Sequence, residues 1–203
     1  MTNGEINQTL KYYNENHQKF NTDTVAVPFS EWQDEFTKYL PVNAYILDCG
    51  CGSGRDSKAF IDKGFTVDAI DGSSEMCKLA SNLINQEVKC MRFDEIDTKD
   101  LYHGIWACAS ILHLPYSEMR LVMSKMNKAL KQSGLMYASF KYGEFEGIRN
   151  DRYFTDMTEE KFHKLINEVG GFEIITTNIT GDVRVGREDE KWLNIILKKV
   201  IAE

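Results

Sequence analysis

The chain has 203 residues, of which 42% are hydrophobic and 27% are charged, so its composition is that of a globular domain rather than a disordered tail, a collagen-like repeat or a disulfide-stapled miniprotein. This length predicts one domain, residues 1–203, with a core of its own. The 24 lysine and arginine residues against 31 aspartate and glutamate residues give a net charge of −7, which does not favour nonspecific binding to a nucleic-acid backbone.

The first forty residues are predicted to be helical. Apolar side chains in Ile6–Phe20 recur at roughly helical spacing, and Ser30–Gln33 has the sequence of a capping box. From residue 44 onward, short apolar runs alternate with helical patterns. Strands are predicted at Ala44–Cys49, Phe65–Ile70, Val88–Phe93, Gly104–Ser110 and Gly134–Phe140, and helices at Arg55–Lys63, Ser73–Ile84, Tyr116–Lys131 and Thr158–Val169. This alternation is typical of right-handed βαβ units and a parallel sheet.

The end of the chain departs from this alternation. Two more strands are predicted at Phe172–Ile179 and Trp192–Val200. The residues between them, 180–191, contain two glycines and many charges, so no helix fits there and the two strands are expected to be antiparallel. Residues 142–157 are polar and aromatic, and we expect them to be irregular.

The five cysteines neither form a Cys-x-x-Cys pair nor lie at zinc-ligand spacing, so no metal site is predicted. Most of them lie in or beside apolar runs, which favours reduced, packed thiols and a cytoplasmic protein. The apolar runs are far shorter than a bilayer span and the first thirty residues are polar and acidic, so neither a membrane segment nor a secretory leader is expected.

A glycine-rich turn follows the first predicted strand. It reads Asp48-Cys49-Gly50-Cys51-Gly52-Ser53-Gly54-Arg55 and leads into a helix. Glycines let a ligand approach the backbone closely, a helix N-terminus favours negative charge, and the Asp48 carboxylate could hold an ammonium group. Arg55 stands where the dinucleotide fingerprint has its third glycine, and no Gly-Lys-Ser/Thr follows, which excludes a nucleoside-triphosphate loop.

Two further acids end the next two predicted strands. Asp71 lies about twenty residues after the turn, where a carboxylate suits the two hydroxyls of a ribose. Phe93 and Asp94 could offer a base an apolar face and an acceptor. The alternatives are that Asp71 caps the following helix and that Asp94 is a solvated loop acid.

Four blocks of the sequence resemble the class I S-adenosylmethionine-dependent methyltransferases, in order and at the strand ends: ILDCGCGSGRDSKAF, VDAIDGSSEM, RFDEID and GIWACASILHLP. The Gly-Arg-Asp that ends the turn is similar to that of small stand-alone bacterial members. The resemblance implies an α/β, Rossmann-like fold with a seven-stranded, mostly parallel sheet, helices on both faces and an antiparallel last strand. It also implies S-adenosylmethionine as the cofactor and S-adenosylhomocysteine as its product. The implied cofactor-binding residues are Asp48, Gly50, Cys51, Gly52, Arg55, Asp71, Gly72, Ser73, Met76, Phe93, Asp94 and Ala109.

The catalytic residues are less evident, because methyl transfer is an in-line displacement in which a protein mainly aligns the reactants. By the resemblance, the end of the fourth strand faces the methyl group. It offers Ser110 and His113, and the ordinary pKa of histidine suits proton removal near neutrality. The block Asn/Asp-Pro-Pro-Tyr, typical of enzymes that methylate exocyclic amines of bases or glutamine, is missing. Residues 1–40 are expected to form a helical lid that brings Tyr13 to the site. The alternative is that His113 only bonds the backbone and Tyr13 only packs.

The acceptor is expected to be small and anionic. Topology brings the segments 142–157 and 180–191 to the ligand-binding edge of the sheet, and arginines there suit a carboxylate or a phosphate. The expected substrate-binding residues are Lys141, Arg149, Arg152, Tyr153, Arg184 and Arg187. The alternative is a pair of solvated loops whose charges are neutralised locally.

The sequence is also compatible with other functions. A tRNA nucleoside is the alternative acceptor, since Arg152-Tyr153-Phe154 is faintly similar to an Arg-Tyr-Tyr segment of some tRNA wobble-base enzymes, although the acidic balance makes nucleic acid an unfavoured partner. An NAD-dependent oxidoreductase would share the turn and Asp71, but not Arg55 or the final hairpin. A non-catalytic S-adenosylmethionine-binding protein is the third class. We expect a monomer or a homodimer.

Overall fold

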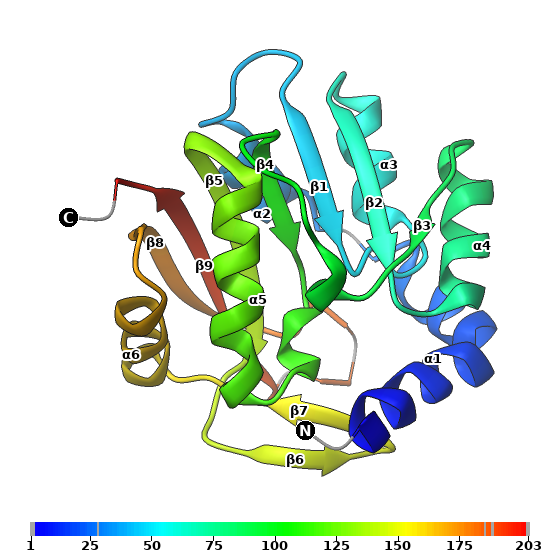
Figure 1. The fold of residues 1–203 in the computed structure, drawn as a ribbon. Coiled ribbons are helices and arrows are strands. Elements are labelled where there is room, and N and C mark those ends of the chain that lie inside the picture. Colours follow the sequence, from blue (N-terminus) through cyan, green and yellow to red (C-terminus); the bar gives the residue numbers. More distant parts are fainter. Residues whose placement is uncertain (1–2, 28, 185, 188, 202–203) are drawn as a thin grey trace.

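The structure is a computed structural model that describes residues 3–27, 29–184, 186–187 and 189–201. Its centre is a seven-stranded sheet of order β3-β2-β1-β4-β5-β9-β8 (Figure 1). The strands of this sheet are β1 Tyr45–Cys49, β2 Thr66–Asp71, β3 Lys89–Cys90, β4 Tyr102–Ala107, β5 Leu130–Lys141, β8 Phe172–Gly181 and β9 Lys191–Lys199. The helices are α1 Asn3–Thr24, α2 Ser30–Thr37, α3 Arg55–Asp62, α4 Ser74–Ile84, α5 Tyr116–Ala129 and α6 Glu159–Val169. Among the described helices, none is long and apolar enough to cross a membrane.

The strand directions agree with the sequence pattern. β1 runs parallel to β2 and β4, and β5 runs parallel to β4. β9 is antiparallel to both of its neighbours, β5 and β8, so it alone is reversed among these strands. The predicted fold, a mostly parallel sheet with an antiparallel last strand, is confirmed.

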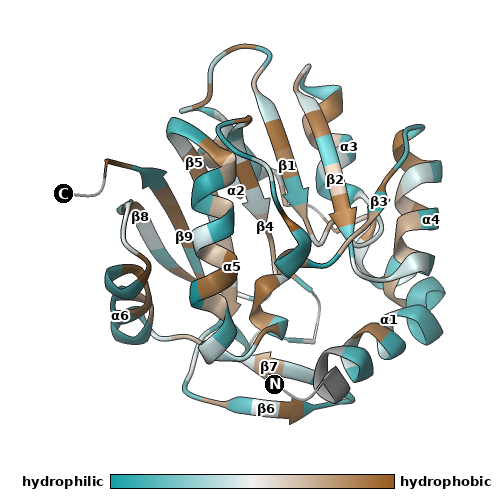
Figure 2. Ribbon diagram, in the orientation of Figure 1, coloured by the Kyte–Doolittle hydropathy of each residue, from teal (hydrophilic) through white to brown (hydrophobic). Residues whose placement is uncertain are grey.

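Alternating side chains bury both faces of the sheet. On one face Leu47, Ile105 and Met136 pack with α5 and α6. On the other face Trp106 and Tyr137 pack with α2 and α3, and their rings stack 3.9 Å apart. Figure 1 shows α5 and α6 in front of the sheet and α2 behind it, and in Figure 2 the inner side of α6 is hydrophobic while its outer side is hydrophilic. Successive side chains of a strand point to opposite faces, and because both faces are covered, nearly all residues of β1 and β4 are buried.

A buried carboxylate joins three elements of the face behind the sheet. Asp56, in the first turn of α3, accepts hydrogen bonds from Nε1 of Trp106 in β4 and from Nε2 of Gln33 in α2, each at 2.8 Å. The predicted capping box at Ser30–Gln33 is wrong: α2 begins at Ser30 itself, and no side chain caps it. Gln33 turns inward because Asp56 is the buried acceptor that needs its donors.

Several segments differ from the prediction. β3 is only two residues long, and Phe93–Glu95 form a 3-10 turn, because the chain leaves the sheet edge after Met91 bonds Asp71. β5 begins at Leu130, where α5 ends. Residues 142–157, expected to be irregular, contain a hairpin of β6 Glu146–Arg149 and β7 Arg152–Thr155. Its two turn residues, Asn150 and Asp151, have φ of 50° and 61°. Positive φ at both central residues is what a two-residue type I′ hairpin turn requires.

The bond between Trp106 and Asp56 can be tested by stability. Trp106→Phe removes the indole N–H and keeps an aromatic ring against Tyr137. We expect the free energy of unfolding, measured by urea denaturation, to fall by about 1–3 kcal/mol, because a buried carboxylate loses a donor. The control is Trp32→Phe in the same cluster, since the Trp32 indole makes no hydrogen bond to any described residue. An equal loss in both variants would contradict the role of the hydrogen bond.

Candidate functional site

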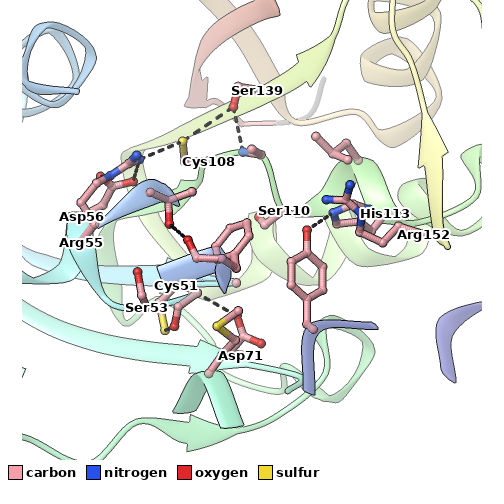
Figure 3. A pocket seen from close by; sticks show the side chains of 18 of the residues that line it. Cys51, Ser53, Arg55, Asp56, Asp71, Cys108, Ser110, His113, Ser139 and Arg152 are labelled. Carbon is pink, nitrogen blue, oxygen red and sulfur yellow. Dashed lines mark hydrogen bonds and ion pairs between the residues drawn. The ribbon is translucent and has the colours of Figure 1, made fainter. Parts of the chain in front are cut away.

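One cavity of about 260 Å³ lies at the carboxyl ends of β1, β2 and β4. It is lined by these predicted cofactor residues: Asp48, Gly50, Cys51, Gly52, Arg55, Asp71, Gly72, Met76, Phe93, Asp94 and Ala109. It is also lined by these predicted catalytic and acceptor residues: Tyr13, Ser110, His113, Lys141, Arg152, Arg184 and Arg187. Figure 3 shows Arg55 on one side of the cavity, His113 with Arg152 on the other side, and Asp71 lower in the view between them. Ser73, Arg149 and Tyr153, although described, do not line it.

The glycine turn lies tightly against the end of β4. Gly50 has φ of 76°, and a Cβ added to it would lie 2.5 Å from Cβ of Ser110. The Ser110 hydroxyl is buried and has no hydrogen-bond partner among the described residues. A buried hydroxyl without a partner costs free energy, so its place in the cavity wall fits a polar ligand group.

Asp71 ends β2 inside the cavity. Its Oδ2 accepts the N–H of Gly52 at 2.9 Å, and its Oδ1 accepts the N–H of Ser73 at 2.8 Å. Burial raises the pKa of this carboxyl, and the two N–H groups oppose the shift. Each carboxylate oxygen can take a further donor, so the group can also bind ligand hydroxyls. The cap of α4 is Ser73, whose hydroxyl accepts from Met76, and not Asp71.

Asp48 and Arg55 line the cavity next to the glycine turn. Asp48 is buried and accepts a 2.6 Å hydrogen bond from the Ser57 hydroxyl. Burial, and then the nearby charge of Asp56, raises the pKa of Asp48 to about 8. A ligand cation at this place would favour the ionised form. The guanidinium of Arg55 bonds Asp56 through Nε and Nη2 and lies over the Phe29 ring.

The remaining cofactor-side residues form apolar and strained walls. Met76 is buried, and the Phe93 ring lies against the Gly50 turn. Asp94 is half exposed and pairs with Arg92, as a solvated loop acid would. It also lines the cavity, as a cofactor-binding acid would. Ala109 has φ of 49°, a conformation that L-residues rarely adopt, and its N–H donates to Ser139 Oγ at 2.8 Å. Such strain is often concentrated at functional sites.

His113 lies at the other end of the cavity between two partners. Its Nδ1 is 2.6 Å from the carbonyl oxygen of Tyr153, which can only accept, so Nδ1 carries the proton. Nε2 therefore accepts from the Tyr13 hydroxyl at 2.8 Å. Burial lowers the pKa of His113 to about 4 and raises the pKa of Tyr13. The expectation that His113 titrates near neutrality is wrong for this reason, and the imidazole is neutral at pH 7.

Most of the predicted acceptor-side cations already have carboxylate partners. Arg184 pairs with Asp182, Arg149 with Asp156, and both Lys141 and Arg187 pair with Glu190. These pairs are the local neutralisation that was the alternative for the acceptor-side charges, although Lys141, Arg184 and Arg187 also line the cavity.

Arg152 differs from the other four, since no described carboxylate pairs with it. Its guanidinium lies over the rings of Tyr12 and Phe154, at 4.4 and 5.2 Å.

Part of the cavity wall comes from β9, which contains none of the predicted site residues. Trp192 and Asn194 of β9 line the cavity, and Asn194 accepts from Tyr137 and donates to Thr180. The signal for Asn194 is a lone polar residue in the apolar run WLNIIL. The described residues contain no group of three or more His, Cys, Asp or Glu side chains that could hold a metal ion.

Comparisons with known proteins agree with this geometry. The sequence profile of a family described as a methyltransferase domain matches residues 46–134. YqeM of Bacillus subtilis (strain 168), named as a presumed methyltransferase, is 25% identical over 145 residues; the match covers 66% of this chain but only 57% of that relative.

Two solved structures resemble the fold. The 1,6-didemethyltoxoflavin-N1-methyltransferase of Burkholderia thailandensis, solved with its acceptor and S-adenosylhomocysteine, has a TM-score of 0.78 at 18% identity; 98% of this chain and 88% of that chain are covered. The [4+2]-cyclase SpnF has a TM-score of 0.69 at 14% identity, covering 85% and 82%. Residues 46–134 therefore match the profile of a methyltransferase domain, and the two solved structures share the fold of this chain.

Proposed function

We propose that the protein transfers a methyl group from S-adenosylmethionine to a small, anionic acceptor. One observation carries this proposal: a single cavity runs from the Asp71 carboxylate and the Gly50 turn to Tyr13, His113 and Arg152. A cofactor and an acceptor bound at its two ends would meet inside one pocket. The main contribution of a protein to methyl transfer is to hold the two reactants in line.

The residues at the cofactor end fit S-adenosylmethionine. Asp71 has acceptor capacity left for ribose hydroxyls, and Asp48 is a buried acid that a ligand ammonium group would ionise. The unpartnered hydroxyl of Ser110 and the exposed backbone of the glycine turn offer polar contacts, while Met76 and Phe93 offer apolar ones for a base. When bound, this cofactor supplies an electrophilic methyl group on a sulfonium.

Tyr13 and His113 are proposed as the catalytic pair. The Tyr153 carbonyl fixes the imidazole tautomer, so His113 Nε2 is free to receive the Tyr13 proton. An acceptor atom that carries a proton would pass it to the Tyr13 oxygen while the Tyr13 proton passes to His113 Nε2. This transfer would accompany formation of the bond to the methyl group and cleavage of the methyl–sulfur bond, with the sulfur leaving as a neutral thioether. Because the pKa of His113 is about 4, this base suits an acceptor whose proton becomes acidic on methylation.

Arg152 is proposed to hold the negative charge of the acceptor. It lines the cavity beside Tyr13 and has no carboxylate partner among the described residues. A planar guanidinium stacked on rings suits a planar carboxylate or a similar anion. The small-molecule acceptor named for the Burkholderia thailandensis enzyme supports a small molecule over a tRNA nucleoside.

Cofactor binding is tested at Asp71. We expect Asp71→Ala to weaken S-adenosylhomocysteine binding in calorimetry by about 1–3 kcal/mol, because ribose hydroxyls lose their acceptor. The control is Asp97→Ala, an exposed acid paired with Lys128 outside the cavity. Circular dichroism checks that both variants fold. Affinity equal to the wild type in a folded Asp71→Ala protein would refute this assignment.

The catalytic pair is tested with Tyr13→Phe. Removing the hydroxyl leaves the ring in place and breaks the path to His113, so kcat should fall on the order of a hundredfold while the Kd for S-adenosylhomocysteine stays unchanged. The neighbouring change Tyr12→Phe keeps the ring under Arg152 and should retain kcat. Normal turnover by Tyr13→Phe would remove the pair from the mechanism and leave His113 a structural role.

The charge of the acceptor is tested with Arg152→Ala. Methylation of a panel of small aromatic acids and their neutral amides is followed with radiolabelled S-adenosylmethionine. We expect acids to be favoured, and their KM to rise on the order of ten- to a hundredfold in Arg152→Ala. Arg149→Ala is the control, since Arg149 lies on the same hairpin but pairs with Asp156 outside the cavity wall. A preference for amides in the wild type would exclude an anionic acceptor.

A further inference from the structure

The first turn of α4 receives a hydrogen-bond acceptor from another helix. A helix start leaves N–H groups without partners inside the helix. Ser73 caps the Met76 N–H with its hydroxyl, at 3.2 Å. The Glu75 N–H instead points to Oδ1 of Asn14 in α1, at 3.3 Å, and the Ser73 hydroxyl donates to the same oxygen at 2.7 Å. Asn14 therefore completes, from α1, the cap of α4.

This contact lies beside the residues expected to hold the ribose. The Ser73 N–H donates to Asp71, so the residue that bonds Asn14 also orients the Asp71 carboxylate. One turn earlier in α1, Leu10 lies against Gly72 so closely that a Cβ there would be 2.7 Å from Cδ2 of Leu10. α1 thus packs directly on the turn between β2 and α4, and Figure 1 shows the two helices meeting at this edge of the molecule.

The same helix is also fastened at the acceptor end. Thr9 Oγ1 accepts the N–H of Tyr153 in β7 at 2.9 Å, and Tyr13 bonds His113. Tyr13 and Asn14 are neighbours in sequence, and a turn of about 100° per residue directs them to different parts of the site. One helix therefore contacts both ends of the cavity, and Asn14 makes its hydrogen bonds to the start of α4.

We propose that Asn14 is a positioning residue that docks α1 on the N-terminus of α4, so that α1 stays closed over the nucleoside and its release controls the departure of the nucleoside product. The inference rests on the proposed function, because the nucleoside is that of the cofactor. Asn14 itself is outside the cavity wall, so it acts through the helix and not by touching the ligand.

The test compares Asn14→Ala, Asn14→Asp and Asn16→Ala. Asn16 is a matched control, since it lies on the same helix and, among the described residues, its side chain bonds only the Tyr12 carbonyl of that helix. The dissociation rate of S-adenosylhomocysteine is measured by surface plasmon resonance. We expect Asn14→Ala to raise it about three- to tenfold, the loss of one or two hydrogen bonds. Asn14→Asp should restore the slow rate, because its carboxylate accepts the same donors and is favoured at a helix N-terminus. Asn16→Ala should match the wild type.

A second readout does not depend on the ligand. In the free protein, hydrogen exchange in α1 should become faster in Asn14→Ala and stay unchanged in Asn16→Ala. Equal dissociation rates in Asn14→Ala and the wild type, or equal effects of Asn14→Ala and Asn16→Ala, would overturn the proposal. If the wild type does not bind S-adenosylhomocysteine, the proposed function fails together with the role in product release, while the exchange data still decide whether Asn14 docks α1.

Discussion

The buried carboxylate of Asp56 is the interaction on which the site depends. Burial alone would raise its pKa, but the Arg55 guanidinium and the donors from Trp106 and Gln33 hold the pKa below its usual value. The charge therefore stays on Asp56, and it adds to burial, the larger cause, in raising the pKa of the neighbouring Asp48. Asp56 thus contributes both to the packing of α2 and α3 behind the sheet and to the raised pKa of an acid in the cavity.

The cavity is assembled by short polar contacts between elements that are far apart in sequence. Asp71 bonds the glycine turn across β1 and β2, and Ser139 of β5 supports the strained Ala109 at the end of β4. At the acceptor end, most cations are neutralised by neighbouring acids. Such pairing offsets part of the desolvation cost of partly buried charges and leaves Arg152 distinct among them.

Much of the fold could be predicted from the sequence, because it depends on local periodicity. The buried strands and the short link between β8 and β9 define the sheet, and the glycine turn with Asp71 marks one end of the cavity. The hairpin at residues 146–155 was missed, since its turn relies on Asn150 and Asp151 in a conformation that their composition alone does not specify. The pairing of Arg184 and the low pKa of His113 could not be read from sequence, because both depend on distances and burial that exist only after folding.

The position of β9 has a consequence for the order in which the protein is made. β9 lies between β5 and β8 and follows both in the chain, so the β5 edge is open and β8 has no strand partner in the sheet until β9 leaves the ribosome. Trp192 and Asn194 arrive with β9, so this part of the cavity wall also forms late. The open edges of β5 and β8 are exposed to aggregation during this interval, and a chaperone or rapid completion of the sheet has its greatest value there.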